Sequence, residues 1–326
     1  MIVSPGIECW GWNDSGQTEI PILNNPTQVG AGDTHTCLID DTELVCWGSN
    51  GYGQTSVPHL TSPTGIGVGD AHSCATADEG VACWGSDENG QTNAPSLATV
   101  RQVDGGAFHS CALAENGVVC WGDDSDGQSD VPDLSNPSQV SAGAFHSCAV
   151  ADSGISCWGY NGDGQTDTPL LDNPIQVSAG GYHTCGLDSS GVSCWGFNDD
   201  GQADVPVLSN PTDVRAGDNY SCAIDDTGLV CWGNDEFKQL SASDLLVPNR
   251  LTAGRFHGCA IQGTSIACWG RNSAGQANVP GVVFDRDKDG VSNRLDTDND
   301  NDGVPDLSLI HISEPTRPLY ITYAVF

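Results

Sequence analysis

The chain has 326 residues, and its 43 acidic against 10 basic side chains give a formal net charge of −33. A surface this acidic repels phosphate backbones and anionic membrane surfaces, which argues against nucleic-acid binding and membrane attachment. No run approaches the ~18 apolar residues of a membrane-spanning helix, and 41 glycines with 17 prolines indicate an all-β chain rich in turns.

The sequence is built from a repeat of 37 residues. Its first cysteine recurs at Cys37, Cys74, Cys111, Cys148, Cys185, Cys222 and Cys259, and a second follows nine positions later each time. A fixed period of this size predicts a solenoid, a propeller or an array, because one unit cannot bury its own apolar face. Residues 18–280 hold seven full units, and residues 1–17 are a partial repeat.

Each unit predicts three short strands. In the fifth unit these are residues 175–180, 182–187 and 192–195, with a turn at 188–191. Residues 205–208 are a candidate for a short fourth strand, although Pro206 restricts it to an edge or a loop. The intervening polar loop ends in a Gly-Gln pair, which we interpret as exposed loop punctuation.

Three motifs carry a family resemblance: Ala-Gly-x-x-His-Ser/Thr-Cys-Ala/Gly-Leu, Gly-Val-x-Cys-Trp-Gly and Asn-x-x-Gly-Gln. Over about residues 7–280 they resemble the repeat of the regulator of chromosome condensation family, whose members are seven-bladed β-propellers. The short repeat is similar to that of secreted bacterial members. The resemblance implies a propeller over residues 1–281, with residues 1–17 adding a strand to the last blade, unless further repeats preceded them. Paired cysteines and an acidic surface depart from the family's pattern and argue against chromatin or exchange-factor roles.

The two cysteines of each unit lie in neighbouring strands of one predicted hairpin, within reach of a disulfide. The predicted bridges are Cys37–Cys46, Cys74–Cys83, Cys111–Cys120, Cys148–Cys157, Cys185–Cys194, Cys222–Cys231 and Cys259–Cys268. The alternatives are buried free thiols and a zinc site that also uses the nearby histidine. Tyr220 replaces that histidine in the sixth unit while both cysteines persist, which argues against zinc. The turn type, and with it the register of the two cysteines, stays open.

So many paired cysteines predict an oxidising compartment, outside the cell or on a bacterial surface. The sequence does not open with a charged segment followed by an apolar one, so we expect a truncation that removed a signal peptide. Cys9 agrees with this expectation, because its partner would fall just before Met1.

A histidine precedes the first cysteine in six units, and a tryptophan follows the second cysteine. A catalytic base is needed once rather than in every blade, so the recurrence favours a structural hydrogen-bonding role for histidine. The tryptophan is predicted to pack between blades. No nucleophile elbow, phosphate loop or dinucleotide fingerprint occurs in a fitting context, and we predict that the protein is not an enzyme.

Residues 282–306 are an aspartate-rich segment with the spacing of calcium ligands. The predicted ligands are Asp285, Asp287, Asp289, Val291 (through its carbonyl), Asn293 and Asp296 in a first loop, and Asp298, Asp300, Asp302, Val304 and Asp306 in a second. Alternating acids around a glycine converge on one hard cation. The doubled loop resembles thrombospondin type 3 repeats. We therefore predict Ca²⁺ in this segment and no cofactor in the propeller, the alternative being a solvated acidic linker.

Residues 307–326 match neither pattern. They resemble the translation of a common sequencing adapter, and we interpret them as an artefact without a structural role. The alternative is a short hydrophobic tail.

Aromatic residues at positions that vary between units are candidates for partner binding. They are Trp12, Tyr160 and Phe197 after the Trp-Gly pair, and Phe108, Phe145, Tyr182 and Phe256 before the recurring histidine. Aromatic side chains on a rigid loop platform suit protein or sugar recognition, and the alternative is packing at the blade edges.

Together these features predict a monomeric, non-enzymatic extracellular scaffold that binds a protein partner and carries a calcium-stabilised stalk. A carbohydrate-binding adhesin or polysaccharide-attachment module is the alternative, and a propeller lyase or hydrolase is a more remote one.

Overall fold

The structure is a computed structural model of the chain, and it describes residues 7–8, 26–40, 43–240, 248, 250–262 and 265–270. The chain divides into two units, Met1–Val279 and Pro280–Phe326, and every described residue belongs to the first. The predicted calcium ligands at 285–306, the segment 307–326, Cys9 and Trp12 therefore lie outside the described residues.

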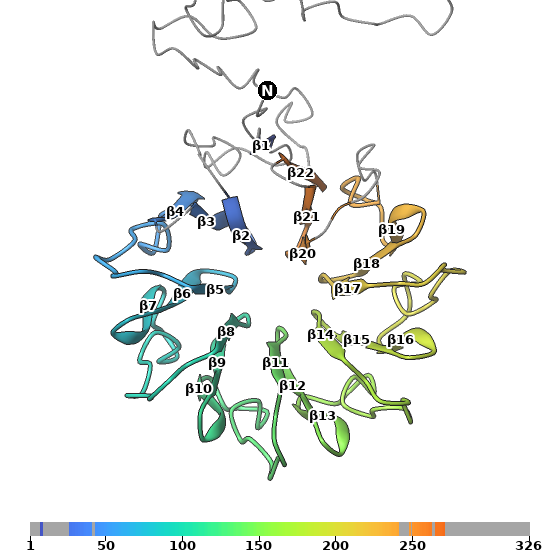
Figure 1. Cartoon of the computed structure of the whole chain (residues 1–326), viewed down its shortest axis with the longest axis horizontal. Helices are drawn as coiled ribbons and strands as arrows, with labels where there is room; N and C mark the ends of the chain where they lie inside the picture. The colour runs from blue at the N-terminus through green and yellow to red at the C-terminus, as the bar shows by residue number, and fades with distance from the viewer. Residues whose placement is uncertain are drawn as a thin grey trace, which may run out of the picture. The chain divides into compact units, whose positions relative to one another are not determined.

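Six sheets of three strands and one of four form the seven blades of a β-propeller, and Figure 1 shows them around a common axis. From blade 1 to blade 7, the inner strands are β2 (Pro26–Ala31), β5 (Gly65–Val68), β8 (Gln102–Gly105), β11 (Gln139–Ala142), β14 (Gln176–Ala179), β17 (Asp213–Ala216) and β20 (Arg250–Ala253). The middle strands are β3 (His35–Asp40), β6 (His72–Ala77), β9 (His109–Ala114), β12 (His146–Ala151), β15 (His183–Asp188), β18 (Tyr220–Asp225) and β21 (His257–Gln262). The outer strands are β4 (Glu43–Gly48), β7 (Gly80–Gly85), β10 (Gly117–Gly122), β13 (Gly154–Gly159), β16 (Gly191–Gly196), β19 (Gly228–Gly233) and β22 (Ser265–Gly270).

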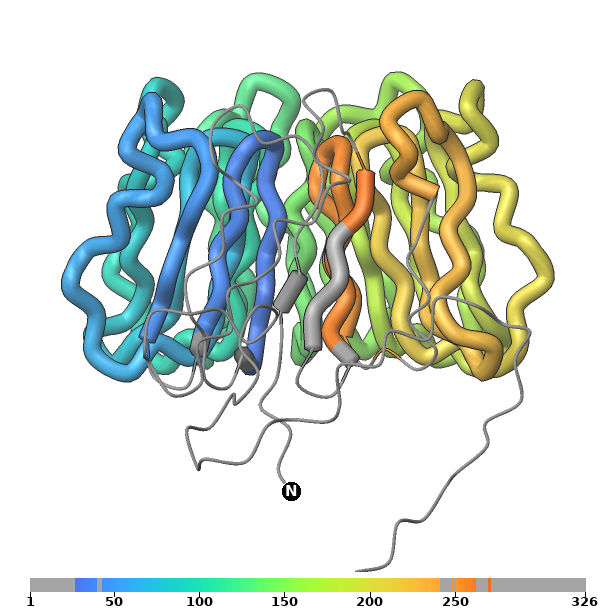
Figure 2. Tube along the Cα trace, turned by 90° about the horizontal axis from the view of Figure 1, so that it is seen from above, coloured from blue at the N-terminus to red at the C-terminus, as the bar shows by residue number. Residues whose placement is uncertain are grey.

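This arrangement confirms the predicted all-β, seven-bladed propeller. Seen from the side, the strands run between the two ends of the ring (Figure 2). The candidate fourth strand at 205–208 has no strand conformation, so the inner, middle and outer strands make up the blade. Within the described ranges, no helix is long and apolar enough to cross a bilayer.

The ring closes where blade 7 meets blade 1. The amide of Arg255 donates to the carbonyl of Gly32 (3.4 Å), and His257 Nε2 lies 3.5 Å from Thr36 Oγ1. The short strand β1 (Ile7–Glu8) pairs in parallel with β22, the outer strand of blade 7. The amino-terminal partial repeat therefore does add a strand to the last blade, as a fourth strand beside three that were already complete.

In blades 2 to 6, two-residue loops join the middle strand to the outer strand and set the cysteine register. In blade 4, Ala151 pairs with Gly154 across the loop, and Cys148 lies directly opposite Cys157. A tight connection fixes the pairing of the strands that follow it. The same alignment of the two cysteines is found in all seven blades.

The apolar core lies between neighbouring blades. Cys185 and Leu187 of blade 5 pack against Val214, Ala223 and Trp232 of blade 6. Clusters of similar composition join other neighbouring blades. A blade therefore buries its apolar face only when the next blade is present. The recurring tryptophan belongs to this core, as predicted.

The loops that lead from an outer strand to the next blade, which we call crossing loops, share a left-handed backbone position. In one of them this position has a residue with a side chain, whereas the others have glycine. The position before the recurring glutamine is a glycine with φ between +74° and +84° in five loops, and the sixth has Lys238 with φ of +66°. A side chain in the left-handed region costs roughly 1–2 kcal/mol that glycine avoids. The ion pair between Lys238 and Asp235, at 3.8 Å, is exposed and offsets little of that cost.

We expect Lys238→Gly to raise the free energy of unfolding by about 0.5–1 kcal/mol, the relieved backbone strain less the greater freedom of glycine in the unfolded chain. The matched variant Gly201→Ala should lower it by about 1 kcal/mol, since no atom lies closer than 3.6 Å to the added methyl and only the backbone is strained. Urea denaturation at pH 7 with disulfides intact measures both. A shift of the two variants in the same direction would contradict this explanation.

Candidate functional site

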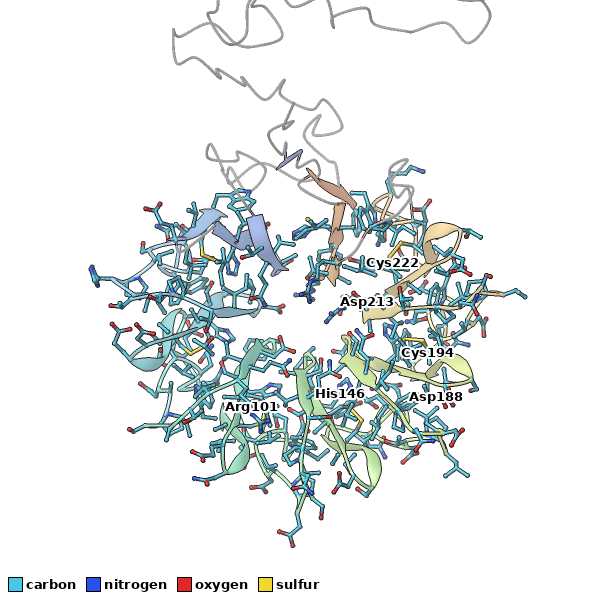
Figure 3. The ribbon with its side chains drawn as sticks, in the orientation of Figure 1. Arg101, His146, Asp188, Cys194, Asp213 and Cys222 are labelled. Carbon is cyan, nitrogen blue, oxygen red and sulfur yellow. A yellow bond between two sulfur atoms is a disulfide. The ribbon has the colours of Figure 1, made fainter. Side chains whose placement is uncertain are left out.

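Six disulfides hold middle and outer strands together, with Cα–Cα distances of 4.0–4.1 Å. They are Cys37–Cys46, Cys74–Cys83, Cys111–Cys120, Cys148–Cys157, Cys185–Cys194 and Cys222–Cys231. Figure 3 labels Cys194 and Cys222, in adjacent blades. Cys259 is also disulfide-bonded and lies opposite Cys268 in the strand register, although the side chain of Cys268 is outside the described set. In these six blades the pairing removes the free-thiol and zinc alternatives.

A buried hydrogen bond links each histidine to the next blade. His146 Nε2 lies 2.8 Å from Thr184 Oγ1 (His146 is labelled in Figure 3). Four equivalent bonds of 2.8–2.9 Å are His35–Ser73, His72–Ser110, His109–Ser147 and His183–Ser221. In blade 6, the Tyr220 hydroxyl instead donates to the His257 carbonyl at 2.7 Å. The recurring histidine is therefore a structural connector, as its repetition predicts.

In the five crossing loops between blades 1 and 6, a glutamine completes this connection. Thr184 Oγ1 and Trp195 Nε1 both donate to the carbonyl of Gln165, each at 2.9 Å. Gln165 Oε1 also accepts from the Asp163 amide within its own loop (3.0 Å). The buried equivalents are Gln54, Gln91, Gln128, Gln165, Gln202 and Gln239. Exposed loop punctuation was therefore the wrong interpretation, and we call the chain of histidine, hydroxyl and glutamine the inter-blade belt.

The belt fixes the protonation state of its histidines. Because the hydroxyl donates to a glutamine carbonyl, it must accept from histidine, which places the proton on Nε2. The Nδ1 atoms of His109 and His146 are buried and have no hydrogen-bond partner. Protonation would thus bury an unpaired charge, and burial lowers the pKa of both residues to about 3.

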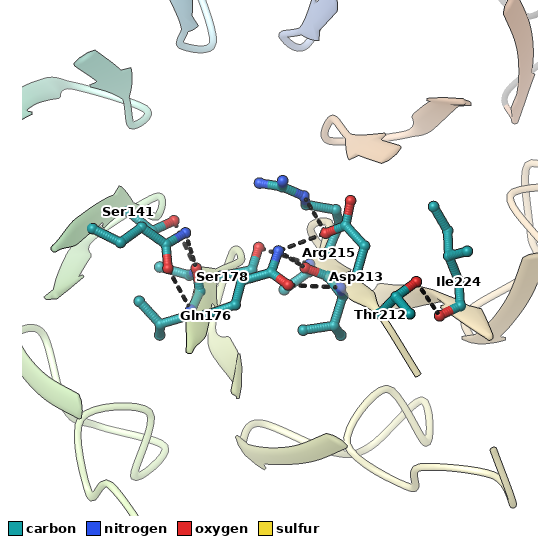
Figure 4. Close-up of polar contacts among 12 residues, drawn as sticks. Ser141, Gln176, Ser178, Thr212, Asp213, Arg215 and Ile224 are labelled. Atoms are coloured by element: carbon teal, nitrogen blue, oxygen red, sulfur yellow. Dashed lines mark hydrogen bonds and ion pairs between the residues drawn. The ribbon is translucent and has the colours of Figure 1, made fainter. Parts of the chain in front are cut away.

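Side chains of the inner strands form a second set of links between blades. Gln176 donates from Nε2 to the Val214 carbonyl (3.0 Å) and accepts the Val214 amide at Oε1 (3.2 Å), as a neighbouring backbone would (Figure 4). Ser178 Oγ accepts the amide of Ala216 at 3.0 Å. Gln102 and Gln139 each make the same pair of hydrogen bonds with the backbone of the following blade. These links position the inner strands around the axis.

Two cavities lie along the axis. The larger has a volume of about 310 Å³, extends along the inner strands, and is lined by Asp104, Arg215 and Arg250 among other polar residues. Arg215 Nε pairs with Asp213 Oδ1 at 3.1 Å (Figure 4). Arg215, which lines this cavity, is therefore already paired with a carboxylate.

The cavity at the carboxyl-terminal ends, which we call the mouth, has a volume of about 160 Å³ and a wall contributed by all seven blades. Its lining is largely Ala-Gly backbone, so the few longer side chains around it set its chemistry. Those side chains divide into an aromatic group on blades 3 to 5 and a charged group on blades 6, 7, 1 and 2.

The aromatic group is a row of five rings in contact, which we call the aromatic arc. Phe108 and Phe145 have ring centroids 6.0 Å apart, and Phe145 and Tyr182 are 5.4 Å apart. Tyr160 lies 6.2 Å from Tyr182, and Phe197 lies 6.4 Å from it. Phe108 is exposed and the others are half-buried. The arc therefore combines edge packing with an accessible apolar surface.

The charged group, which we call the acidic rim, consists of Asp33, Asp70 and Asp218 around Arg255. Arg255 Nη1 lies 3.6 Å from Asp70 Oδ2, and its Nε lies 3.5 Å from Asp218 Oδ2. Burial raises the pKa of Asp70 to about 6, and Asp33 and Asp218 add to this while Arg255 opposes it. Burial also raises the pKa of Asp218.

The structure brings together five of the seven predicted aromatic candidates. Phe256 lies apart from the arc, 5.2 Å from Phe237 and 5.1 Å from the Arg255 guanidinium. Trp12 is outside the described residues. Sequence reasoning missed the acidic rim. The observation that could have revealed it is the position two residues before the histidine, which is Asp or Arg in four units and Ala or Gly in the other three.

The protein is a seven-bladed β-propeller whose blades have the same strands and inter-blade links, and differ in the loop residues that surround the mouth. Four segments of the chain, residues 27–54, 100–128, 138–165 and 175–202, match the Regulator of chromosome condensation (RCC1) repeat. The resemblance seen in the sequence is therefore supported at the level of the repeat. No curated protein sequence matches the chain.

Solved structures with RCC1-like or WD40-like propellers are similar to this chain. The CRINKLY WD40 ectodomain of the Arabidopsis thaliana receptor kinase ACR4 is 25% identical, with a TM-score of 0.61 over 76% of this chain and 98% of that one. The ectodomain of the Physcomitrella patens receptor kinase CR4 is 23% identical, with a TM-score of 0.63 over 76% and 74%. Prp20p from Saccharomyces cerevisiae is 16% identical, with a TM-score of 0.60 over 77% and 84%.

The belt predicts a loss of stability in mild acid. The belt histidines have pKa values lowered by burial to about 3 or about 4, whereas unfolded histidine titrates near 6.5. As pH falls below 6.5, the unfolded state takes up protons that the folded state does not. Each histidine then removes about 1.4 kcal/mol of stability per pH unit, down to its folded pKa. The carboxyls of Asp70, whose pKa is raised to about 6, and of Asp104 and Asp218, whose pKa values are also raised, oppose this loss but are fewer than the histidines.

We therefore expect the free energy of unfolding to fall by several kcal/mol between pH 7 and pH 5. Urea denaturation with disulfides intact, repeated at half-unit steps, measures this slope. His146→Gln removes one titrating group, so its slope should be smaller by about 1.4 kcal/mol per pH unit, whatever its stability at pH 7. A flat profile between pH 7 and pH 5 would show that these histidines do not titrate as the structure requires.

Proposed function

We propose that the protein is a non-enzymatic extracellular scaffold that binds a protein partner at the mouth of its propeller. The aromatic arc is the observation that carries this proposal, because its rings stand on loops of three successive blades that the belt holds rigid. Rings held in place in this way bury a large area on binding at a small cost in entropy.

Two further observations support the proposal. Six disulfides indicate an oxidising environment, which favours a location outside the cell or on a bacterial surface. Among similar structures, one is the ectodomain of a plant receptor kinase, and the yeast protein Prp20p binds Gsp1p and histones. Propellers of this architecture are thus used as protein-binding platforms.

We further propose that residues 282–306 form a calcium-binding stalk of the thrombospondin type 3 kind. The support is the ligand spacing, with acids at alternate positions around Gly290 in the first loop and Gly303 in the second. Calcium would neutralise part of an otherwise self-repelling acidic segment and stiffen the link to whatever anchors the propeller.

Carbohydrate binding is the second candidate function, favoured by the hydroxyl-bearing rings of Tyr160 and Tyr182 in the arc. Sugar rings stack on aromatic faces and need polar groups beside them. A glycan array probed with and without calcium distinguishes this function, since a protein-specific mouth leaves the array silent in both conditions.

For the protein-binding function, we expect Phe145→Ser with Tyr182→Ser to weaken partner retention at least tenfold, because central aromatic residues dominate interface energies. The assay is quantitative capture of proteins from extracellular medium on the immobilised chain. Tyr52→Ser is the matched control, because Tyr52 is 59% exposed and lies in a loop of blade 1, outside the arc. Equal retention by the arc variant and by the control would reject the mouth as the binding surface.

For the stalk, calorimetric titration with CaCl₂ should show calcium binding that MgCl₂ does not reproduce, because flexible carboxylate loops suit Ca²⁺ better than Mg²⁺. Asp287→Asn with Asp289→Asn should weaken the first site at least tenfold by removing two ligand charges. Asp133→Asn, an exposed acid of the propeller, removes one negative charge outside the segment and should leave binding unchanged. If Asp133→Asn weakens calcium binding equally, the binding is non-specific attraction of the cation to an acidic chain, and the proposed site is rejected.

A further inference from the structure

The two halves of the mouth come from two adjacent positions in the repeat. Two residues before the recurring histidine, blades 3 to 5 have only Ala107, Ala144 and Gly181, whereas the other blades have the members of the acidic rim. One residue before it, blades 3 to 5 have rings of the aromatic arc. Small residues beside the rings leave one apolar side of the mouth open, opposite a charged side.

The two halves meet at Gly181. A Cβ added there would collide with the Asp218 carboxylate, which lies over this glycine. The neighbouring Tyr182 has its pKa raised by partial burial and by the charge of Asp218. A carboxylate and the apolar arc are thus available to one bound group at the same place.

The acidic rim carries more negative charge than its own arginine can balance. Three carboxylates act on the single guanidinium of Arg255, and together they raise its pKa against the effect of burial. The two ion pairs, at 3.5 and 3.6 Å, are longer than the 2.7–2.9 Å that is usual for charge-assisted bonds. The Arg255 side chain is 43% exposed. The rim therefore attracts a further positive charge.

The size of the mouth restricts what it admits. Its volume of about 160 Å³ is below the ~300–1,000 Å³ of pockets for drug-sized ligands and close to the ~150 Å³ of a cavity that holds benzene. Such a space fits the end of one long side chain. The chain itself shows the favoured environment at this end of the propeller, where the Arg255 guanidinium lies over the ring of Phe256 at 5.1 Å.

We propose that the mouth binds a lysine or arginine side chain presented by the protein partner, with apolar residues on either side of it. The cationic end pairs with Asp70 and Asp218 in competition with the Arg255 guanidinium that lies between them. The flanking apolar residues pack on Phe145 and Tyr182. This inference deepens the proposed function and rests on it, since it names the chemistry of the partner at the same surface. A partner of opposite charge also suits a chain with a net charge of −33.

The test uses the full chain and two acetylated, amidated pentapeptides, Gly-Phe-Lys-Phe-Gly and the same peptide with norleucine in place of lysine. Dissociation constants come from NMR titration at pH 7.5 and 50 mM NaCl. We expect the lysine peptide to bind at least tenfold more tightly and to weaken in 500 mM NaCl, while the norleucine peptide does not change with salt. Equal binding of both peptides, or binding of neither, would overturn the proposal.

Variants of the rim separate charge recognition from damage to the fold. Asp70→Asn and Asp218→Asn should each weaken the lysine peptide about fivefold or more, and Asp133→Asn should not. Arg255→Gln should strengthen the lysine peptide, because it removes the competing cation, and a damaged fold would not produce such a gain. Unchanged affinity in Arg255→Gln and Asp218→Asn would also overturn the proposal.

The two proposals can fail separately. If the peptides do not distinguish charge while the arc variant still loses captured partners, the mouth binds proteins by another chemistry and only this inference falls. If the arc variant retains every partner, the protein-binding function at the mouth falls first.

Discussion

Most blades hold the next through the Nε2 proton of a buried histidine, and blade 6 does so through the hydroxyl of Tyr220. The imidazole donates from Nε2 to a hydroxyl of the following blade, and that hydroxyl donates to a glutamine carbonyl at the end of the crossing loop. A buried donor or acceptor without a partner costs about 1–3 kcal/mol. The loss of one member of the belt therefore leaves the groups bonded to it unsatisfied. The belt therefore fixes the spacing of the blades and the conformation of the loops between them.

The disulfides and the belt act at different levels of the structure. Each of the six bridges lies within one hairpin and joins cysteines nine positions apart in the sequence. In the chain-entropy model such a bridge is worth about 2.5 kcal/mol. Such a bridge stabilises a blade but cannot join it to another. The joining is done by the belt, by the inner-strand glutamines and by apolar clusters shared between blades. Reduction would thus weaken each blade, while the hydrogen bonds of the belt and of the inner-strand glutamines keep their donors and acceptors.

Periodicity made the fold predictable, because a repeat of constant length leaves few ways to bury an apolar face. The cysteine pairs and the inter-blade tryptophans followed from the same regularity. The buried role of Gln165 and its equivalents was missed because a polar residue beside glycine is typical of an exposed turn. Gln165 is buried because its carbonyl accepts hydrogen bonds from Thr184 and Trp195 of the next blade, which lie 19 and 30 positions further along the chain. Local pattern alone does not contain that contact.

The acidic rim was hidden for a different reason. Its members lie about one or several repeats apart, and no single unit shows that Asp70, Asp218 and Arg255 meet across the axis. Ring closure brings blade 7 beside blade 1, where Arg255 also reaches Asp70 of blade 2, so the site exists only once the whole propeller has formed. Blade 6 illustrates how the frame tolerates this variation. Tyr220 replaces the belt histidine there and still reaches blade 7 through its hydroxyl, while Asp218, two residues earlier, takes part in the rim. Because either a histidine or a tyrosine can link one blade to the next, the adjacent positions can vary between blades, and they determine the chemistry of the mouth.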